Sequence, residues 1–393
     1  MTTRATITLS SAQVIGGVQN HLYGANLEHF GQSVYGGHWA EMLQDRKFSG
    51  QDQMYIGLQE GLRHEYVGFG VVRPWIPINP NNKHVRFVHD NTIFFSGRQS
   101  QRITVERDDG ESHGIEQRNL YLEKTRTYQI RLVLRGTVDV VTVSLGDQTW
   151  SIKNGSDTWT TYETNLIPEN TNSDGALSIA FVGIGTLWIG AASVMPADNI
   201  KGHRQDVIDA ILDWSPTFLR WPGGNFVSAY HWQDGIGCRD KRSTRLDPAF
   251  SLLEPNDVGT DEFIDLCRLL KAEPILTVNM GTGTPEEAAA WVEYCNGDDG
   301  TKHGRLRAIN GYEEPHNVKT WFVGNELFGN WQVGHVDPET YARLYLDFAR
   351  AMKRADADLR LIAVGVPIDL YGRWNEFVLK QCREEMDQLS LHY

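Results

Sequence analysis

Two different patterns of hydrophobic and polar residues divide the chain. Between about residues 50 and 198, short runs of β-branched and aromatic residues alternate with turns rich in Gly, Asp and Asn. In the run TYQIRLVLRG, every second residue from Tyr128 to Leu134 is apolar, which places these side chains on one face of a strand. Many short strands in succession are typical of an all-β sandwich, and we expect one here.

From about residue 200 onward, helical and strand-like patterns alternate. The helical runs are, in order, HRQDVIDAILDW, TDEFIDLCRLLKA, TPEEAAAWVEYC, DPETYARLYLDFARAMKRA and NEFVLKQCREEM. Each is followed by a strand-like run, and these are, in the same order, TFLRW, PILTVNM, KTWFVGNE, LRLIAVG and DQLSLHY. Repeated units of this kind predict a parallel sheet covered by helices. The nearly continuous apolar strands agree with burial on both faces of that sheet.

Two of these helices have clear start signals. Thr284 stands before Pro285, and Glu287 follows three residues after the threonine, which predicts a capping box at the start of a helix. Asp337 and Pro338 repeat the pairing of a capping residue with a proline at the first helical position.

An additional strand near the N-terminus, around HLYGANLEHFG, completes the expected architecture. The predicted fold class is α/β, a (β/α)8-type TIM barrel of which strands one to six are present, with an inserted all-β sandwich domain. We therefore expect the first barrel strand in residues 1–49, the sandwich in residues 50–198 and barrel strands two to six in residues 199–393. TIM barrels carry their catalytic residues at the C-terminal ends of the strands.

Polar residues stand at five of the six predicted strand ends. They are Glu28, Arg220, Asn279, the pair Asn325 and Glu326, and His392. Because the C-terminal ends of parallel strands meet at one rim, we expect these side chains to surround a common site.

Glu326 is the expected general acid of that site. Aromatic residues surround it in the sequence WFVGNELFGNW, and a carboxyl group in an aromatic, partly dry pocket should have a raised pKa. Asn325 is placed to bind a sugar hydroxyl beside the reacting bond. The alternative is that Glu326 is a surface carboxylate or pairs with Arg220.

The sequence allows two interpretations for each of three further residues. Arg220, in RWPGGN, either faces a ligand in the barrel mouth or forms a structural pair with a carboxylate. Trp232, in YHWQDGIG, either stacks on a sugar or packs in the core. His392 either belongs to the site or is an ordinary hydrogen-bonding histidine at a strand end.

Composition excludes several classes of function. The chain has 393 residues, 40% of them hydrophobic, and a net charge of −13, so neither nucleic acid nor an anionic membrane is an expected partner. No apolar run reaches the length of a membrane span. The N-terminal MTTRATITLSSAQVIGG lacks the apolar core of a signal peptide, so we expect a cytoplasmic protein.

Cofactors are not expected either. The four cysteines are widely separated, which indicates reduced thiols without metal-ligand spacing. Neither HEYVGFG nor GHVDPE has the spacing of a metal site, and no glycine-rich phosphate-binding loop precedes a helix.

Four motifs then resemble a known family. LYGANLEHFGQSVYGG, LRWPGGNFVSAYHWQDGIG, WFVGNELFGNWQVGH and LSLHY together resemble glycoside hydrolase family 51, the α-L-arabinofuranosidases, and they occur in the order of that family. The similarity covers about residues 20–48 and 200–393. GGHWAEMLQDRKFSG is similar to the subgroup that carries a carbohydrate-binding-module-like β-sandwich between strands one and two.

The resemblance implies a retaining glycosidase of L-arabinose metabolism. It would remove terminal α-L-arabinofuranosyl residues from arabinan- or arabinoxylan-type oligosaccharides. By motif, Glu326 matches the family's acid/base and Asn325 its substrate-binding neighbour, while Glu28, Arg220 and His392 match residues of the arabinose subsite. We also expect substrate contacts from Asn225, Trp232 and Asn279.

One part of the family pattern is not in these 393 residues. The nucleophile glutamate of the family lies on strand seven, so we expect it beyond residue 393 and expect the chain alone to be catalytically incomplete. An endo-β-1,4-glucanase of the same family and a non-catalytic carbohydrate-binding homologue remain as alternatives. Arabinose-containing saccharides are the expected partners, and assembly into a homo-oligomer is left open.

Overall fold

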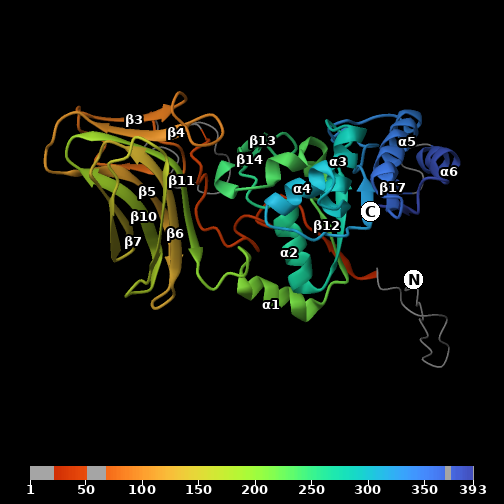
Figure 1. The fold of residues 1–393 in the computed structure, drawn as a ribbon, viewed down its shortest axis with the longest axis horizontal. Helices are drawn as coiled ribbons and strands as arrows, with labels where there is room; N and C mark the ends of the chain where they lie inside the picture. The colour runs from red at the N-terminus through yellow and green to blue at the C-terminus, as the bar shows by residue number, and fades with distance from the viewer. Residues whose placement is uncertain (1–21, 51–67, 368–372, 393) are drawn as a thin grey trace, which may run out of the picture.

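The computed structural model describes residues 22–50, 68–367 and 373–392. A β-rich part and a helix-rich part lie side by side, and the chain passes from the second to the first and back (Figure 1). The N-terminal segment that carries the signal-peptide expectation, and residues 51–67 at the start of the predicted insertion, lie outside the described residues. Among the helices described, none combines the length and apolar character needed to cross a membrane.

Six parallel strands form the sheet of the helix-rich part, which confirms the predicted first six strands of the barrel. Their order in the sheet is β1 (Gly24–Asn26), β12 (Phe218–Trp221), β15 (Glu273–Val278), β16 (Thr320–Val323), β17 (Arg360–Val364) and β18 (Gln388–Ser390). The order in the sheet follows the order in the chain, as right-handed β/α units require. All six strands therefore direct their C-terminal ends toward one rim.

The helices agree with the apolar stripes in the sequence. They are α1 (Gln205–Trp214), α2 (Thr260–Leu270), α3 (Pro285–Asn296), α4 (Lys302–Ile309), α5 (Pro338–Ala355) and α6 (Trp374–Cys382), with short 3₁₀ turns η3 (Asn225–Ala229), η4 (Trp232–Gly235) and η5 (Arg239–Lys241). The sequence did not predict α4, whose stripe is weak, but Thr301 caps it by accepting a 3.1 Å hydrogen bond from the Gly304 amide. Nor did it predict the hairpin of β13 (Arg245–Asp247) and β14 (Leu252–Glu254).

Only one of the two hydrogen bonds of the capping box predicted at the start of α3 is present. The Thr284 hydroxyl accepts a hydrogen bond from the backbone of Glu287 at 3.2 Å. The Glu287 carboxylate does not return to the capping residue, because it accepts a 2.9 Å hydrogen bond from His231 instead. The second cap is present as expected, since Asp337 accepts from the Thr340 amide at 2.8 Å.

The β-rich part consists of two five-stranded antiparallel sheets. The strand order of the first sheet is β2 (Ile76–Ile78), β5 (Ser112–Leu122), β10 (Asn172–Val182), β7 (Val140–Leu145) and β8 (Gln148–Lys153). The strand order of the second sheet is β3 (Val85–Asp90), β4 (Ser100–Val105), β11 (Gly185–Pro196), β6 (Tyr128–Gly136) and β9 (Thr160–Leu166). Both sheets contribute to one apolar core. The predicted face of β6, from Tyr128 to Leu134, lies in this core.

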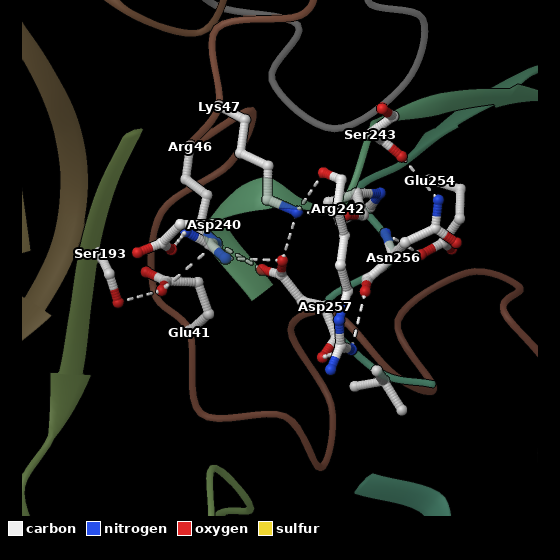
Figure 2. Close-up of polar contacts among 12 residues, drawn as sticks. Glu41, Arg46, Lys47, Ser193, Asp240, Arg242, Ser243, Glu254, Asn256 and Asp257 are labelled. Carbon is white, nitrogen blue, oxygen red and sulfur yellow. Dashed lines mark hydrogen bonds and ion pairs between the residues drawn. The ribbon is translucent and has the colours of Figure 1, made fainter. Parts of the chain in front are cut away.

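Buried charges join the two parts (Figure 2). Arg46, on the segment that leads into the sandwich, donates 2.7 Å hydrogen bonds to Asp240 and to Asp257 of the barrel part. Lys47 lies 2.8 Å from Asp257, and Arg131 of β6 donates to Asp240 at 2.7 Å. Burial alone would raise the pKa of Asp257, but the charges of Arg46 and Lys47 hold it well below its usual range.

Candidate active site

Arg220, on β12, is the centre of a hydrogen-bonded group at the rim of the parallel sheet. Its buried guanidinium donates to Asn26 at 3.2 Å, to Thr277 at 3.1 Å and to Asn325 at 2.9 Å. The ring of Phe322 lies 4.3 Å beneath it. One arginine thus links four neighbouring strands, because Asn26 lies in β1, Thr277 lies in β15 and Asn325 follows β16.

No carboxylate of the described residues lies within ion-pair distance of Arg220, so the expected alternative of a structural ion pair is not what the structure contains. Burial lowers the pKa of Arg220 to about 10, and the charges of Glu28 and Glu326 oppose that shift. The direct hydrogen-bond partners of this buried cation are therefore neutral, although two carboxylates lie near enough to act on its pKa.

Asn325 is buried and has a defined amide orientation. Its Oδ1 accepts from Arg220, so its Nδ2 donates to Asn225 Oδ1 at 3.3 Å and to Gln332 Oε1 at 3.2 Å. The two bonds from Nδ2 are at the long end of the range for this type of hydrogen bond.

Glu326 follows directly, with a backbone φ of 28° that non-glycine residues rarely adopt. Its Oε1 accepts a 2.8 Å hydrogen bond from His392 Nδ1, and its Oε2 accepts one of 2.8 Å from the Trp331 indole. The bond from His392 lowers the pKa of Glu326, burial opposes this shift, and Trp331 adds to it. The expected rise in pKa is therefore wrong for this arrangement, because two donors stabilise the charged form.

Glu28 approaches the same rim through two glycines. Oε1 of Glu28 accepts from the Phe226 amide at 3.1 Å. A Cβ on Gly223, whose φ is +88°, would lie 2.6 Å from the Cβ of Glu28, and a Cβ on Gly224 would lie 2.7 Å from its Oε2. Only glycine at both positions allows the carboxylate to lie against this turn.

Comparison with known proteins shows what this chain is similar to. Residues 210–376 match the model of the α-L-arabinofuranosidase 1 domain. The probable α-L-arabinofuranosidase C of Aspergillus fumigatus is 45% identical over 187 residues, which cover 48% of this chain and 37% of that protein. The intracellular exo-α-(1→5)-L-arabinofuranosidase of Acetivibrio thermocellus is 41% identical over 194 residues, 49% of this chain and 39% of that protein.

Over about half of its length the chain is therefore similar to α-L-arabinofuranosidases. The arabinose-bound structure of the MgGH51 α-L-arabinofuranosidase has a TM-score of 0.72 to it, at 21% identity, and the match covers 88% of this chain and 59% of that one. This likeness confirms the fold of a partial TIM barrel with additional sheets. The chain spans less than two fifths of the length of the two curated relatives named above.

The hydrogen bonds of the Asn279 side chain do not go to the Arg220 group. Its Oδ1 accepts from the Gly281 and Thr282 amides at 2.9 Å, and its Nδ2 donates to the Tyr230 carbonyl at 3.1 Å and to the Thr282 hydroxyl at 3.0 Å. These bonds use the hydrogen-bonding capacity of the amide. The predicted substrate contact is therefore wrong, and Asn279 shapes the turn after β15.

Trp232 is a core residue. Only 1% of it is exposed, and its ring lies 6.4 Å from Trp291 and 5.1 Å from Tyr294. Its indole donates to the Glu287 carbonyl at 3.1 Å. The core reading is confirmed and the sugar-stacking reading is wrong, because no face of the ring is open to a ligand.

Two residues of the group were not chosen from the sequence. Trp331 is 51% exposed beside the carboxylate that it contacts, and Gln332 joins Asn325 to the hydroxyl of Ser228. Both follow Glu326 in the same loop, so the aromatic and polar composition of FGNWQ was the available signal. Among the described residues, no cluster of three or more metal-binding side chains occurs.

Proposed function

We propose that this protein is a retaining α-L-arabinofuranosidase that releases terminal arabinofuranosyl units from arabinan- or arabinoxylan-type oligosaccharides, with Glu326 as general acid/base. The observation that carries the proposal is the Glu326 carboxylate, which His392 and Trp331 hold at 2.8 Å each on the rim where the Arg220 group also ends. The curated relatives named as arabinofuranosidases supply the sugar.

The lowered pKa of Glu326 has a direct consequence for the mechanism. A general acid must carry a proton before it protonates the leaving oxygen, and two hydrogen-bond donors oppose this. In a retaining site the second carboxylate lies about 5 Å away, and its charge raises the pKa of the acid until the glycosyl-enzyme forms. We propose that a glutamate encoded beyond residue 393 provides this charge and attacks the anomeric carbon.

The remaining residues bind the sugar in this proposal. The Glu28 carboxylate uses Oε1 for the Phe226 amide, which leaves Oε2 for a furanose hydroxyl. Asn225 and Asn325 exchange their 3.3 Å mutual hydrogen bond for bonds to a second hydroxyl. Arg220 stays in place beneath them, since its three bonds hold it to separate strands.

The test compares leaving groups in the product of the full reading frame. For Glu326→Gln we expect a loss of about 10²- to 10⁴-fold in kcat/KM with nitrophenyl α-L-arabinofuranoside. We expect a much smaller loss in the glycosylation step with the dinitrophenyl substrate, whose leaving group needs no proton. Glu376→Gln is the matched control, because that exposed carboxylate lies on α6 and pairs with Arg373.

Equal losses with both substrates would contradict the acid/base assignment. Release of reducing ends from a β-1,4-glucan, with no release of arabinose, would instead support the endo-glucanase alternative. Binding of arabino-oligosaccharides without turnover by the full-length product would support the non-catalytic alternative. For residues 1–393 alone we expect no efficient hydrolysis.

A further inference from the structure

A pocket of about 460 Å³ lies between the sandwich and the barrel part, separate from the Arg220 group. Its lining comes from three adjacent strands of one sheet and from two loops: Gln129, Ile130, Arg131, Glu163, Thr164, Asn165, Ser193, Met195, Asn199 and Arg239. Among these strands, β11 lies on the side of the sandwich nearest to the helix-rich part (Figure 1). A volume of this size is in the range of small-molecule binding sites.

Strand register places the polar side chains of this pocket in rows. Arg131 of β6 pairs in register with Ser193 of β11 on one side and with Glu163 of β9 on the other. Gln129 and Asn165 form the next row on the same face, because side chains two residues apart point in the same direction.

Four of the polar groups that line the pocket have no hydrogen bond or ion pair with another described residue. They are the two amides of Gln129 and Asn165, the Glu163 carboxylate and the Arg239 guanidinium. Arg239 stacks on the ring of Trp39 at 5.0 Å, and this leaves its N–H donors available in the plane of the guanidinium.

Arg131, which also lines the pocket, differs from these four groups because its charge is paired. Its guanidinium donates to Asp240 at 2.7 and 2.8 Å, and the neighbouring Ser193 hydroxyl donates to Glu41 at 2.6 Å. Those bonds belong to the junction described above, to which Ser193, Glu41 and Asp240 contribute (Figure 2). The four unused groups are thus a separate set, on the open side of the same junction.

The chemistry of the set selects the kind of ligand. Amides, carboxylates and guanidinium groups are planar and offer neighbouring donors or acceptors, which match the adjacent hydroxyls of a sugar ring. Among the lining residues, Met195 is the apolar one on the face of Gln129 and Arg131, since the Ile130 side chain points into the sandwich core, and this is too little apolar surface for a hydrophobic ligand. An inorganic anion would gain from Arg239 but would face the Glu163 carboxylate.

We propose that this pocket binds a neutral sugar unit, held by Gln129, Glu163 and Asn165 from the sandwich and by Arg239 from the barrel part. The identification of that unit as part of an arabinose-bearing polysaccharide rests on the proposed function, whereas the presence of a sugar site does not. A polysaccharide bound here contacts both parts of the protein at once.

The test is calorimetric titration of the chain with neutral arabinoxylo-oligosaccharides and arabino-oligosaccharides. Loss of one hydrogen bond to a neutral hydroxyl weakens binding by about 2- to 10-fold, so the double variant Glu163→Gln with Asn165→Ala should lose about tenfold or more. Arg239→Gln should weaken binding by about tenfold, since its donors are charged. Arg135→Gln is the matched control, because Arg135 lies on β6 over the ring of Trp188 and outside the pocket.

Each outcome bears on the proposal. Weakened binding in the pocket variants but not in Arg135→Gln supports it, provided that the melting temperatures of the variants remain that of the parent. Unchanged binding in all variants overturns it, as does tighter binding of a uronic-acid-bearing oligosaccharide or of inorganic phosphate than of a neutral one. Hydrolysis of an aryl arabinofuranoside by the full-length product tests the active site alone, so failure there leaves the pocket result independent.

Discussion

Replacing Asp257 by Asn should cause a large loss of stability. The Asp257 carboxylate is 1% exposed and contacts both Arg46, at 2.7 Å, and Lys47, at 2.8 Å. Asparagine keeps the shape and one acceptor oxygen but removes the negative charge. Two buried cations would then lie side by side, with Asp240 as the nearest remaining carboxylate of Arg46.

The magnitude follows from what each cation retains. Removing one partner of a buried ion pair costs about 3–5 kcal/mol, because the other charge stays buried without compensation. Lys47 keeps hydrogen bonds to the carbonyls of Arg242 and Pro255, and burial already lowers its pKa to about 8. It can therefore lose its proton and limit the damage, which places our expectation near 3 kcal/mol, at the lower end of that range.

The assay is unfolding in urea, followed by tryptophan fluorescence and by circular dichroism. Coincident transitions from the two signals would justify a single free energy of unfolding for this two-part protein. Glu384→Gln is the control, since its ion pair with Arg383 is exposed and should contribute no measurable stability. A change below about 1 kcal/mol for Asp257→Asn would refute the claim that these charges hold the two parts together.

Three further predictions concern pH, the glycine turn and the Glu326 carboxylate. Burial lowers the pKa of His38 well below its ordinary value and the pKa of His203 to about 4, so below about pH 6.5 the unfolded chain binds protons that the folded chain does not. The contribution of these histidines to the free energy of unfolding should therefore be complete above about pH 6.5 and decrease as the pH falls toward 4. A free energy of unfolding that does not change over this interval would contradict the prediction. Gly224→Ala in the full-length enzyme should displace the Glu28 carboxylate and lower kcat/KM by about tenfold or more, with little change in melting temperature. Unchanged kinetics would show that the close approach of Glu28 to Gly224 is unimportant. Trp331→Phe removes one donor to the Glu326 carboxylate, so the pKa of Glu326 should rise. If Glu326 is the acid/base that we propose, the basic limb of the kcat/KM profile should move to higher pH, whereas an unmoved limb would assign the indole another role.

The architecture was accessible from the sequence because burial leaves a periodic trace. The apolar alternation of β6 and the helical stripes of α1, α2, α3 and α5 are repeated over several turns or residues, and the structure contains these elements. The weak stripe of α4 and the short β13–β14 hairpin leave no such trace, since their residues are held by local hydrogen bonds rather than by one apolar face.

The roles of individual side chains at the site were harder to predict from the sequence. Trp232 and Asn279 stand at plausible positions along the chain, but whether an indole faces solvent or an amide has spare hydrogen bonds depends on packing that no local pattern encodes. The pKa of Glu326 illustrates the same limit. The donor that lowers it most, His392, lies 66 residues further along the chain, and the sequence indicated a shared rim but not a 2.8 Å contact.

The shared ion pairs also restrict how this architecture can be rearranged. Arg131 is supplied by the sandwich and Asp240 by the barrel part, at 2.7 Å from each other. A barrel without its insertion would keep only Arg46 as the described partner of Asp240, and an isolated sandwich would carry Arg131 without its carboxylate. Exchange of this insertion between homologous barrels therefore requires that the acidic and basic partners be transplanted together.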